Sequence, residues 1–445
     1  MIIRSEHFCL GQDRTRIKDP RDGQRQTRTV DELLYRMYND DPDERCEIQI
    51  LADEVGMGKT FVALGAAYSV LAGMGPERTP ESLRGCYRKV LIITPKNSAL
   101  FEKWNREVGE FVKRCAFPQH RDLARRQFRS KRVERLDDFA SACNLSKSAR
   151  VIVTNFGLFY NTKFRNDDLK RRIVLGLLFR VWGNSFSKDA RLRLLRGAPA
   201  GWPRNPNELL QLTEKDLKRL SIVPDELRLA IAQLYAREQR VGSGPILDLL
   251  ETCKNIATPY VRNRDVLFRK VDQELIVVYR AICMSFIRRD FPLVIVDEAH
   301  NWKNGPSDGA NGYRGFEKLI GRRTRTALLL TATPFQLRPD EILEILKISD
   351  SMAYSPTKEG RIRRKEALRT LRDQVVRPVL DNSSRASQNF LCAWSKLPAA
   401  VTRNTLSSIW DSPELITARQ ELDQEADFKG VVEPTRINRS PKERR

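Results

Sequence analysis

A glycine-rich segment near the start of the chain has the residue types that bind phosphate groups. Residues 52–60 read Ala-Asp-Glu-Val-Gly-Met-Gly-Lys-Thr and follow a short apolar run. In such a loop the backbone N–H groups, here those of Gly56, Met57 and Gly58, can surround phosphate oxygens at the N-terminus of the next helix. Lys59 would reach the β- and γ-phosphates and Thr60 would bind Mg²⁺. The segment predicts a site for ATP and Mg²⁺.

A second segment places two carboxylates directly after an apolar run. Leu293–Val296 is followed by Asp297 and Glu298. Successive residues of a strand point in opposite directions, so the two side chains can take different tasks. Asp297 would bind the magnesium, and Glu298 would align and deprotonate the attacking water. Buried carboxylates without a cation or a proton would be costly, which favours this catalytic interpretation.

A third segment supplies hydroxyl groups at the end of another apolar run. Residues 328–334 read Leu-Leu-Leu-Thr-Ala-Thr-Pro. The hydroxyls of Thr331 and Thr333 could bond the loop that contains His300 and could sense the γ-phosphate. Serine and threonine turns are common, so this segment gains its meaning from following the carboxylates by one strand.

Five apolar runs predict the strands that position these segments. Continuous apolar runs are typical of parallel strands that helices cover on both faces. The runs are Ile48–Leu51, Val90–Ile93, Val151–Val153, Leu293–Val296 and Ala327–Leu330. Helical patterns, such as Phe61–Leu71 and Phe101–Arg114, alternate with them and predict an α/β, doubly wound fold. Ligands of such folds bind beyond the carboxyl ends of the strands.

The uneven spacing of the runs predicts a domain organisation. The third and fourth runs are too far apart for an ordinary connection, so a helical, basic insertion is predicted between them. Leucines with helical spacing in the insertion include Leu209, Leu212 and Leu217. The predicted parts are an N-terminal extension (1–23), two halves of one ATPase lobe (24–160 and 291–350), the insertion (161–290) and a helical C-terminal extension (351–445).

The charge of the chain indicates a polyanionic partner. The 445 residues include 79 Lys and Arg against 57 Asp and Glu, a formal net charge of +22. Nucleic acid is the commonest partner of so basic a protein, although a generally basic, solubilising surface is the alternative. The basic stretch Arg114–Arg135, which includes Phe128, either lines a groove that follows phosphates or forms a solvated helix face.

Other features of the composition predict a cytoplasmic, nucleoid-associated protein without a membrane partner. Apolar runs such as Ile173–Phe179 are much shorter than the roughly 20 residues of a spanning helix. The first residues lack the apolar core and cleavage site of a signal peptide. The eight cysteines contain no C-x-x-C pair, so reduced and buried thiols are expected.

Taken in order, the segments resemble those of superfamily 2 helicases, and among them the Swi/Snf-type double-stranded DNA translocases. Residues 53–60 resemble motif I of that family, including Asp53 where a general phosphate-binding loop has glycine. Residues 297–304, Asp-Glu-Ala-His-Asn-Trp-Lys-Asn, resemble its DEAH-type motif II. Thr94-Pro95 with Leu100, Trp104 and Glu107 is similar to motif Ia, Val151–Phe156 to motif Ib and Thr331–Pro334 to motif III.

The resemblance implies a RecA-like P-loop NTPase lobe that couples ATP hydrolysis to movement on double-stranded DNA. It implies that Lys96 and Thr154 contact the nucleic acid. It also implies that His300, Thr331 and Thr333 couple the nucleotide state to that contact. Gln26 would read the adenine, with Gln24 as the competing position.

The resemblance covers residues 24–157 and 291–350, which correspond to one of the two lobes that such motors need. No Gln-x-x-Gly-Arg-x-x-Arg-like motif follows Pro334, and about 110 residues remain, fewer than a second lobe requires. We therefore expect weak hydrolysis by this chain alone. The chain would be a truncated product, a gene fragment, or one half of a split motor whose other lobe is carried by a second polypeptide. An ATP- and DNA-binding subunit without catalysis, half of a split motor, and an RNA helicase are the alternatives. The Lys303-Asn304 extension argues against the RNA helicase.

Overall fold

The computed structural model gives the positions of most of the predicted elements. The structure describes residues 1–41, 45–52, 56, 58–75, 79–144, 149–160, 168–199, 202–219, 222, 224–258, 263–302, 316, 320–331, 352, 362, 366, 369–370, 372–395 and 410–426. The chain forms two compact units. The first comprises residues 1–332 and 351–354, and the second comprises residues 333–350 and 355–445.

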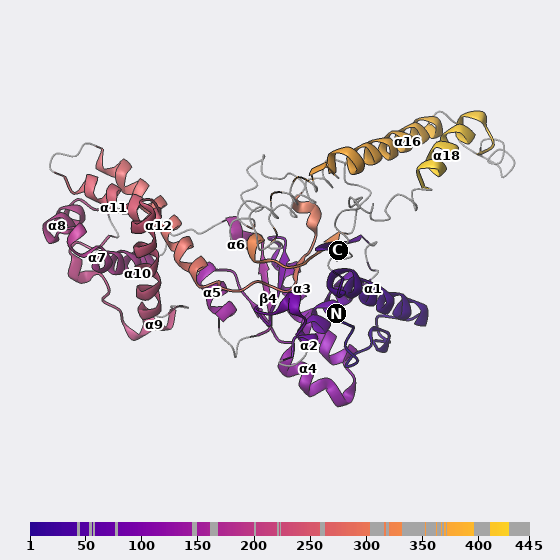
Figure 1. Ribbon diagram of the computed structural model, residues 1–445, viewed down its shortest axis with the longest axis horizontal. Coiled ribbons are helices and arrows are strands. Elements are labelled where there is room, and N and C mark those ends of the chain that lie inside the picture. Colours follow the sequence, from indigo (N-terminus) through magenta and orange to yellow (C-terminus); the bar gives the residue numbers. More distant parts are fainter. Residues whose placement is uncertain are drawn as a thin grey trace, which may run out of the picture. The chain divides into compact units, whose positions relative to one another are not determined.

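A parallel sheet forms the centre of the first unit (Figure 1). Its strands, within the described residues, are β1 (Ile48–Ala52), β2 (Val90–Thr94), β3 (Ser130–Arg132), β4 (Val151–Asn155), β5 (Val294–Val296) and β6 (Ala327–Thr331). They lie in the order β1-β6-β5-β2-β4-β3, and every adjacent pair is parallel. The five predicted strands and the α/β class are confirmed. The edge strand β3 was not predicted, because its Ser-Lys-Arg sequence has no apolar signal.

Helices α1 (Pro20–Tyr38), α2 (Lys59–Gly73), α3 (Ser98–Cys115), α4 (Arg121–Gln127), α5 (Leu136–Asn144) and α6 (Gly157–Tyr160) accompany the strands. Asp19 starts α1 by accepting a hydrogen bond from the Arg21 N–H, with proline at the first helical position. Asn97 starts α3, because its side chain accepts hydrogen bonds from the backbone N–H groups of Ala99 and Leu100. Helix α2 is buried from Phe61 to Leu71, as the predicted apolar pattern requires.

The central strands of the sheet are buried on both faces, whereas β1 and β3 at its edges are partly exposed. All five residues of β2 are buried, as are all three of β5 and all five of β6. Phe8, from the segment expected to be an extension, is also buried, with its ring 5.1 Å from that of Phe111 and 5.6 Å from that of Tyr68. The first residues therefore belong to the core of this unit.

The predicted insertion is helical in its described residues. It contains α7 (Asp168–Trp182), α8 (Lys188–Arg196), α9 (Glu214–Arg219), α10 (Pro224–Val241), α11 (Pro245–Ile256) and α12 (Arg264–Ser285). The helix expected over Leu209 and Leu212 is wrong. Thr213 and Asp216 form a reciprocal pair of cap hydrogen bonds, and this pair starts α9 only at Glu214.

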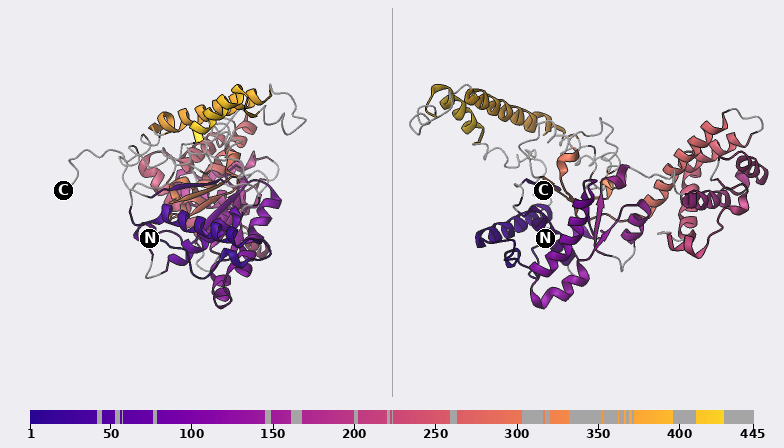
Figure 2. Two further views of the ribbon diagram at one scale, coloured as in Figure 1. Left: turned by 90° about the vertical axis from the view of Figure 1, so that its right-hand side faces the viewer. Right: turned by 180° about the vertical axis from the view of Figure 1, so that it is seen from behind.

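The second unit, described by itself, contains a short π-helix over Arg372–Val376 followed by α16 (Arg377–Ser395), and α18 (Pro413–Ala426). The two helices pack against one another, and the Asn389 amide donates to Glu421 over 3.1 Å. The views of Figure 2 show both helices. None of the helices in the described part of the chain is long and apolar enough to cross a membrane.

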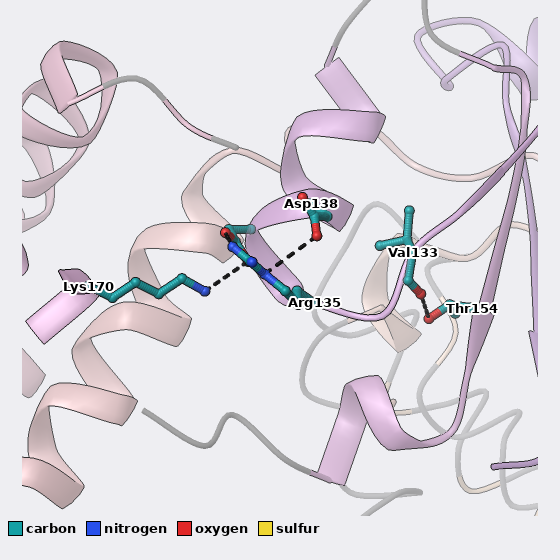
Figure 3. Close-up of polar contacts among 6 residues, drawn as sticks. Val133, Arg135, Asp138, Thr154 and Lys170 are labelled. Carbon is teal, nitrogen blue, oxygen red and sulfur yellow. Dashed lines mark hydrogen bonds and ion pairs between the residues drawn. The ribbon is translucent and has the colours of Figure 1, made fainter. Parts of the chain in front are cut away.

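A buried ionic cluster joins the insertion to α5. The Asp137 carboxylate is 3% exposed, accepts hydrogen bonds from Arg135, and forms an ion pair with Lys170 of α7 over 3.2 Å. Figure 3 shows Lys170 and Arg135 together, with Asp138 on the other side of the guanidinium. Burial acts to raise the pKa of Asp137, but the two cations outweigh burial and the net shift is downward.

Replacing Asp137 by asparagine should destabilise the protein by about 3 kcal/mol, because Arg135 and Lys170 would lose their shared anion. The matched control is Asp138→Asn, since Asp138 is more exposed than Asp137 and lies farther from Arg135, at 3.5 Å. Urea unfolding followed by circular dichroism measures both. Equal midpoints for the two variants would contradict the assignment.

The same cluster predicts a pH dependence. The folded pKa of Asp137 lies below its ordinary value. The stabilisation of the fold by the charged Asp137 is therefore complete above the ordinary aspartate pKa of about 4. It is lost as pH falls through the pKa that Asp137 has in the folded protein. The stability difference between the native chain and Asp137→Asn should be constant from pH 8 to 5 and should narrow in acid.

Candidate functional site

The strand order brings the three predicted segments to one edge of the sheet. Strands β1, β6 and β5 are neighbours, and Ala52 at the end of β1 is paired with Thr331 at the end of β6. Val296, at the end of β5, is the residue before the carboxylates. Because parallel strands end at the same edge, the carboxyl ends of β1, β5 and β6 lie together.

The loop after β1 has a backbone that glycine permits. Gly56 and Gly58 have φ angles of 90° and 88°, in the left-handed region where other residues are strained. Gly58 is the N-cap of α2 and offers no side chain to its first N–H groups. These groups, together with the helix dipole, favour an anion at this position. Met57 lies outside the described residues.

Asp297 is held in place by three hydrogen bonds at the end of β5. Its backbone N–H donates to the Ile93 carbonyl over 2.8 Å. Its Oδ2 accepts a 2.6 Å bond from the indole N–H of Trp104, and its Oδ1 accepts a 3.0 Å bond from the Glu298 N–H. Burial raises the pKa of Asp297 above its ordinary value, while Trp104, the Glu298 N–H and two lysines oppose that shift.

Glu298 has an unusual backbone conformation. Its φ of 50° is in the left-handed region, which a non-glycine residue rarely adopts outside turns and functional sites. Burial and then the charge of Asp297 raise the pKa of the Glu298 carboxyl, against opposing effects of His300 and two lysines. The raised pKa brings this carboxylate closer to the range in which a general base works.

His300 connects the second and third segments. Its Nδ1 lies 3.3 Å from Oε2 of Glu298 and 3.4 Å from Oγ1 of Thr331. Thr331 is buried at the end of β6. Glu298, His300 and Thr331 therefore form one polar cluster. Thr333 lies outside the described residues.

Two lysines partly offset the negative charge of the carboxylates at this edge of the sheet. Lys59, in the first turn of α2, and Lys103, on α3, both act to lower the pKa values of Asp297 and Glu298. Both lysines thus lie close enough to the carboxylate pair to act on its charge. Thr60 follows it in the first turn of α2 and is partly exposed. The lysines of this arrangement suit phosphate oxygens. Its carboxylate and hydroxyl oxygens suit Mg²⁺.

Gln26 is the glutamine that lies against the loop. It is buried on α1, and a Cβ added to Gly58 would come within 2.4 Å of its Nε2. Gln24 is exposed. The structure thus places Gln26, and not Gln24, beside the candidate phosphate-binding segment.

The two residues expected to contact nucleic acid have different environments. Lys96 is exposed after β2, and its side chain lies near Gly157 at the start of α6. Thr154 is fully buried, and its hydroxyl donates to the Val133 carbonyl over 2.8 Å (Figure 3). The Thr154 hydroxyl is thus not at the surface, where a phosphate would meet it.

The basic stretch 114–135 runs from the end of α3 through α4 and β3 to the residues before α5. Its aromatic residue, Phe128, is 2% exposed and packs 5.3 Å from the Tyr68 ring, so it offers no surface for stacking with bases. Arg132 lies between Glu102 and Glu134, with both carboxylates in ion-pair contact. Arg125, Arg126 and Arg129 are exposed, which agrees with a solvated face for that part of the stretch.

No protein-family model matches the chain, and comparison with curated proteins finds no similar sequence. The geometry therefore carries the functional argument. Sequence reasoning named Trp104 only as part of a motif and did not mention Lys103. The indole and its carboxylate partner are 193 positions apart, and no spacing rule relates such residues.

The two glycines of the loop allow a matched test. Gly56→Ala should cost about 1 kcal/mol of stability from backbone strain alone, because no atom of the described residues lies within 4 Å of the added methyl group. Gly58→Ala should cost about 1 kcal/mol more, because the methyl group meets the buried Gln26 side chain.

The free energy of unfolding in urea is measured for both glycine variants, for Gln26→Ala, and for Gly58→Ala combined with Gln26→Ala. The double variant should lose less stability than the sum of the losses of Gly58→Ala and Gln26→Ala measured singly, because the shortened side chain leaves room for the methyl group. Additive effects would show that Gln26 does not lie against the loop.

Proposed function

We propose that this chain is the first, RecA-like lobe of a DNA-dependent ATPase of the superfamily 2, Swi/Snf type. The observation that carries the proposal is the convergence of Lys59, Asp297, Glu298, His300 and Thr331. Lys59 begins α2 after two left-handed glycines, and the other four residues come from the end of β6 and from the residues that follow β5, its neighbour in the sheet. The all-parallel sheet with its accompanying helices is compatible with that lobe.

Each residue has a role that follows from its environment. Lys59 would hold the β- and γ-phosphate oxygens, with the first N–H groups of α2. Thr60 and Asp297 would hold Mg²⁺, which when bound neutralises charge on the phosphates. Glu298 would orient a water and accept its proton, and His300 would keep the Glu298 carboxylate in place.

Two features support double-stranded DNA as the partner. The net charge of +22 favours a polyanion. Lys96 is exposed at the carboxyl end of β2, next but one to β6 in the sheet and near the start of α6. A lysine contact with phosphate carries no base information, so we expect little sequence preference.

Glu298→Gln should reduce Mg-ATP turnover by about 100-fold or more while ATP binding persists, because the amide cannot accept the proton. Steady-state hydrolysis is measured with and without double-stranded DNA. We expect slow turnover by the native chain and stimulation by DNA.

Equal turnover by Glu298→Gln and the native chain would disprove the role of Glu298. ATP binding without any turnover in either protein would favour the alternative, a nucleotide-binding subunit whose partner completes the site.

The salt dependence of DNA binding tests Lys96. Lys96→Ala should weaken binding to duplexes of any sequence. The plot of log binding constant against log salt concentration has a negative slope, and the variant should make that slope shallower by about one. Lys113→Ala is the matched control, since Lys113 is exposed near the other end of α3. Fluorescence anisotropy over a range of salt concentrations measures both, and identical slopes for the two variants would contradict the contact.

A further inference from the structure

We propose that Trp104 is a positioning residue of the metal site, and that its indole N–H holds the Asp297 carboxylate in the orientation that binds Mg²⁺. The inference rests on the proposed function, because it takes Asp297 as the magnesium ligand. It assigns a role to a residue of α3 that touches neither nucleotide nor metal.

The contact is short and well defined. The indole N–H of Trp104 donates to Oδ2 of Asp297 over 2.6 Å, and Trp104 is 1% exposed. The Glu298 N–H fixes the other carboxylate oxygen over 3.0 Å. Because each carboxylate oxygen can accept two bonds, both oxygens keep a lone pair for a cation. The two donors therefore fix the rotation of the carboxylate without occupying its metal-binding capacity.

A buried tryptophan does not by itself demand such a partner. Trp182, on α7, is also 1% exposed, and its indole nitrogen has no hydrogen-bond partner among the described residues. Phenylalanine would fill much of the same space in α3 without a polar atom. The choice of tryptophan at position 104, with a carboxylate as acceptor, points to the N–H group as the functional part.

The place of Trp104 in the fold suits a fixed donor. Helix α3 follows β2, which is the neighbour of β5 in the sheet, and its start is fixed by the Asn97 cap. The indole lies in the same apolar core as α2, the helix that begins with Lys59. The exposed Lys103 next to it cannot replace the indole, since its charge is screened by water and fixes no rotation.

The test separates metal binding from nucleotide binding. The probe is a methylanthraniloyl derivative of ATP, whose fluorescence anisotropy reports its binding to the full chain. Its affinity is measured in EDTA, and the Mg²⁺ concentration that gives half of the magnesium-dependent increase in binding is measured separately. Trp104→Phe is compared with Trp182→Phe, which removes the same volume and no hydrogen bond.

Trp104→Phe should raise the half-saturating Mg²⁺ concentration by about tenfold, the effect of losing one hydrogen bond to a charged group. The affinity in EDTA should stay within about twofold, because the bond concerns only the metal ligand. Trp182→Phe should leave both values unchanged. A fall in both affinities, or an unchanged Mg²⁺ requirement, would overturn the inference.

A second replacement keeps the test valid if the smaller ring disturbs folding. Benzothienylalanine at position 104 keeps the bicyclic shape and lacks the N–H group, so it should reproduce the tenfold effect. A normal Mg²⁺ requirement with this residue would show that ring packing is what matters and would overturn the inference. A native chain that binds the probe without any response to Mg²⁺ would instead disprove the proposed function, and the role of Trp104 with it.

Discussion

Two adjacent carboxylates at the end of a buried strand impose the main electrostatic constraint on this protein. Asp297 and Glu298 follow three fully buried residues of β5, and burial is the largest cause of the raised pKa of each. Their charged forms require compensation. The surrounding elements supply it as an indole N–H from α3, lysine charge from α2 and α3, and an imidazole in the loop after β5. The arrangement of the site follows from this need.

The sequence predicted the central strands well because every residue of β2, β5 and β6 is buried. Runs such as Val90–Ile93 and Ala327–Leu330 have an apolar residue at every position, and their short length distinguishes them from a buried helix such as α2. The site residues Lys59, Asp297 and Glu298 directly follow such strands or their loops, so their convergence could be inferred from strand ends alone. The polar strand β3 gave no such signal, because an edge strand can tolerate polar residues on both faces.

The parts that sequence reasoning missed depend on contacts between distant positions. The bonds of Trp104 with Asp297 and of Thr154 with Val133 require knowledge of which strands are neighbours and how their helices return. Thr154 shows the difficulty well, since a hydroxyl in a motif-like segment can serve either a ligand or a backbone carbonyl. Only its full burial in β4 decides that it bonds a carbonyl in this structure.

The insertion leaves the site intact because both of its ends are attached close together. Its first helix, α7, is tied through Lys170 to Asp137 of α5. At its other end, after α12, the Phe286 carbonyl accepts a bond from Asn144 of α5, and the Asp290 carbonyl accepts one from the backbone of Tyr87 before β2. The cost of closing a long connection rises only slowly with its length. With both ends fixed beside α5 and β2, strand β5 keeps its register, and the carboxylates reach the same edge as they would with a short loop.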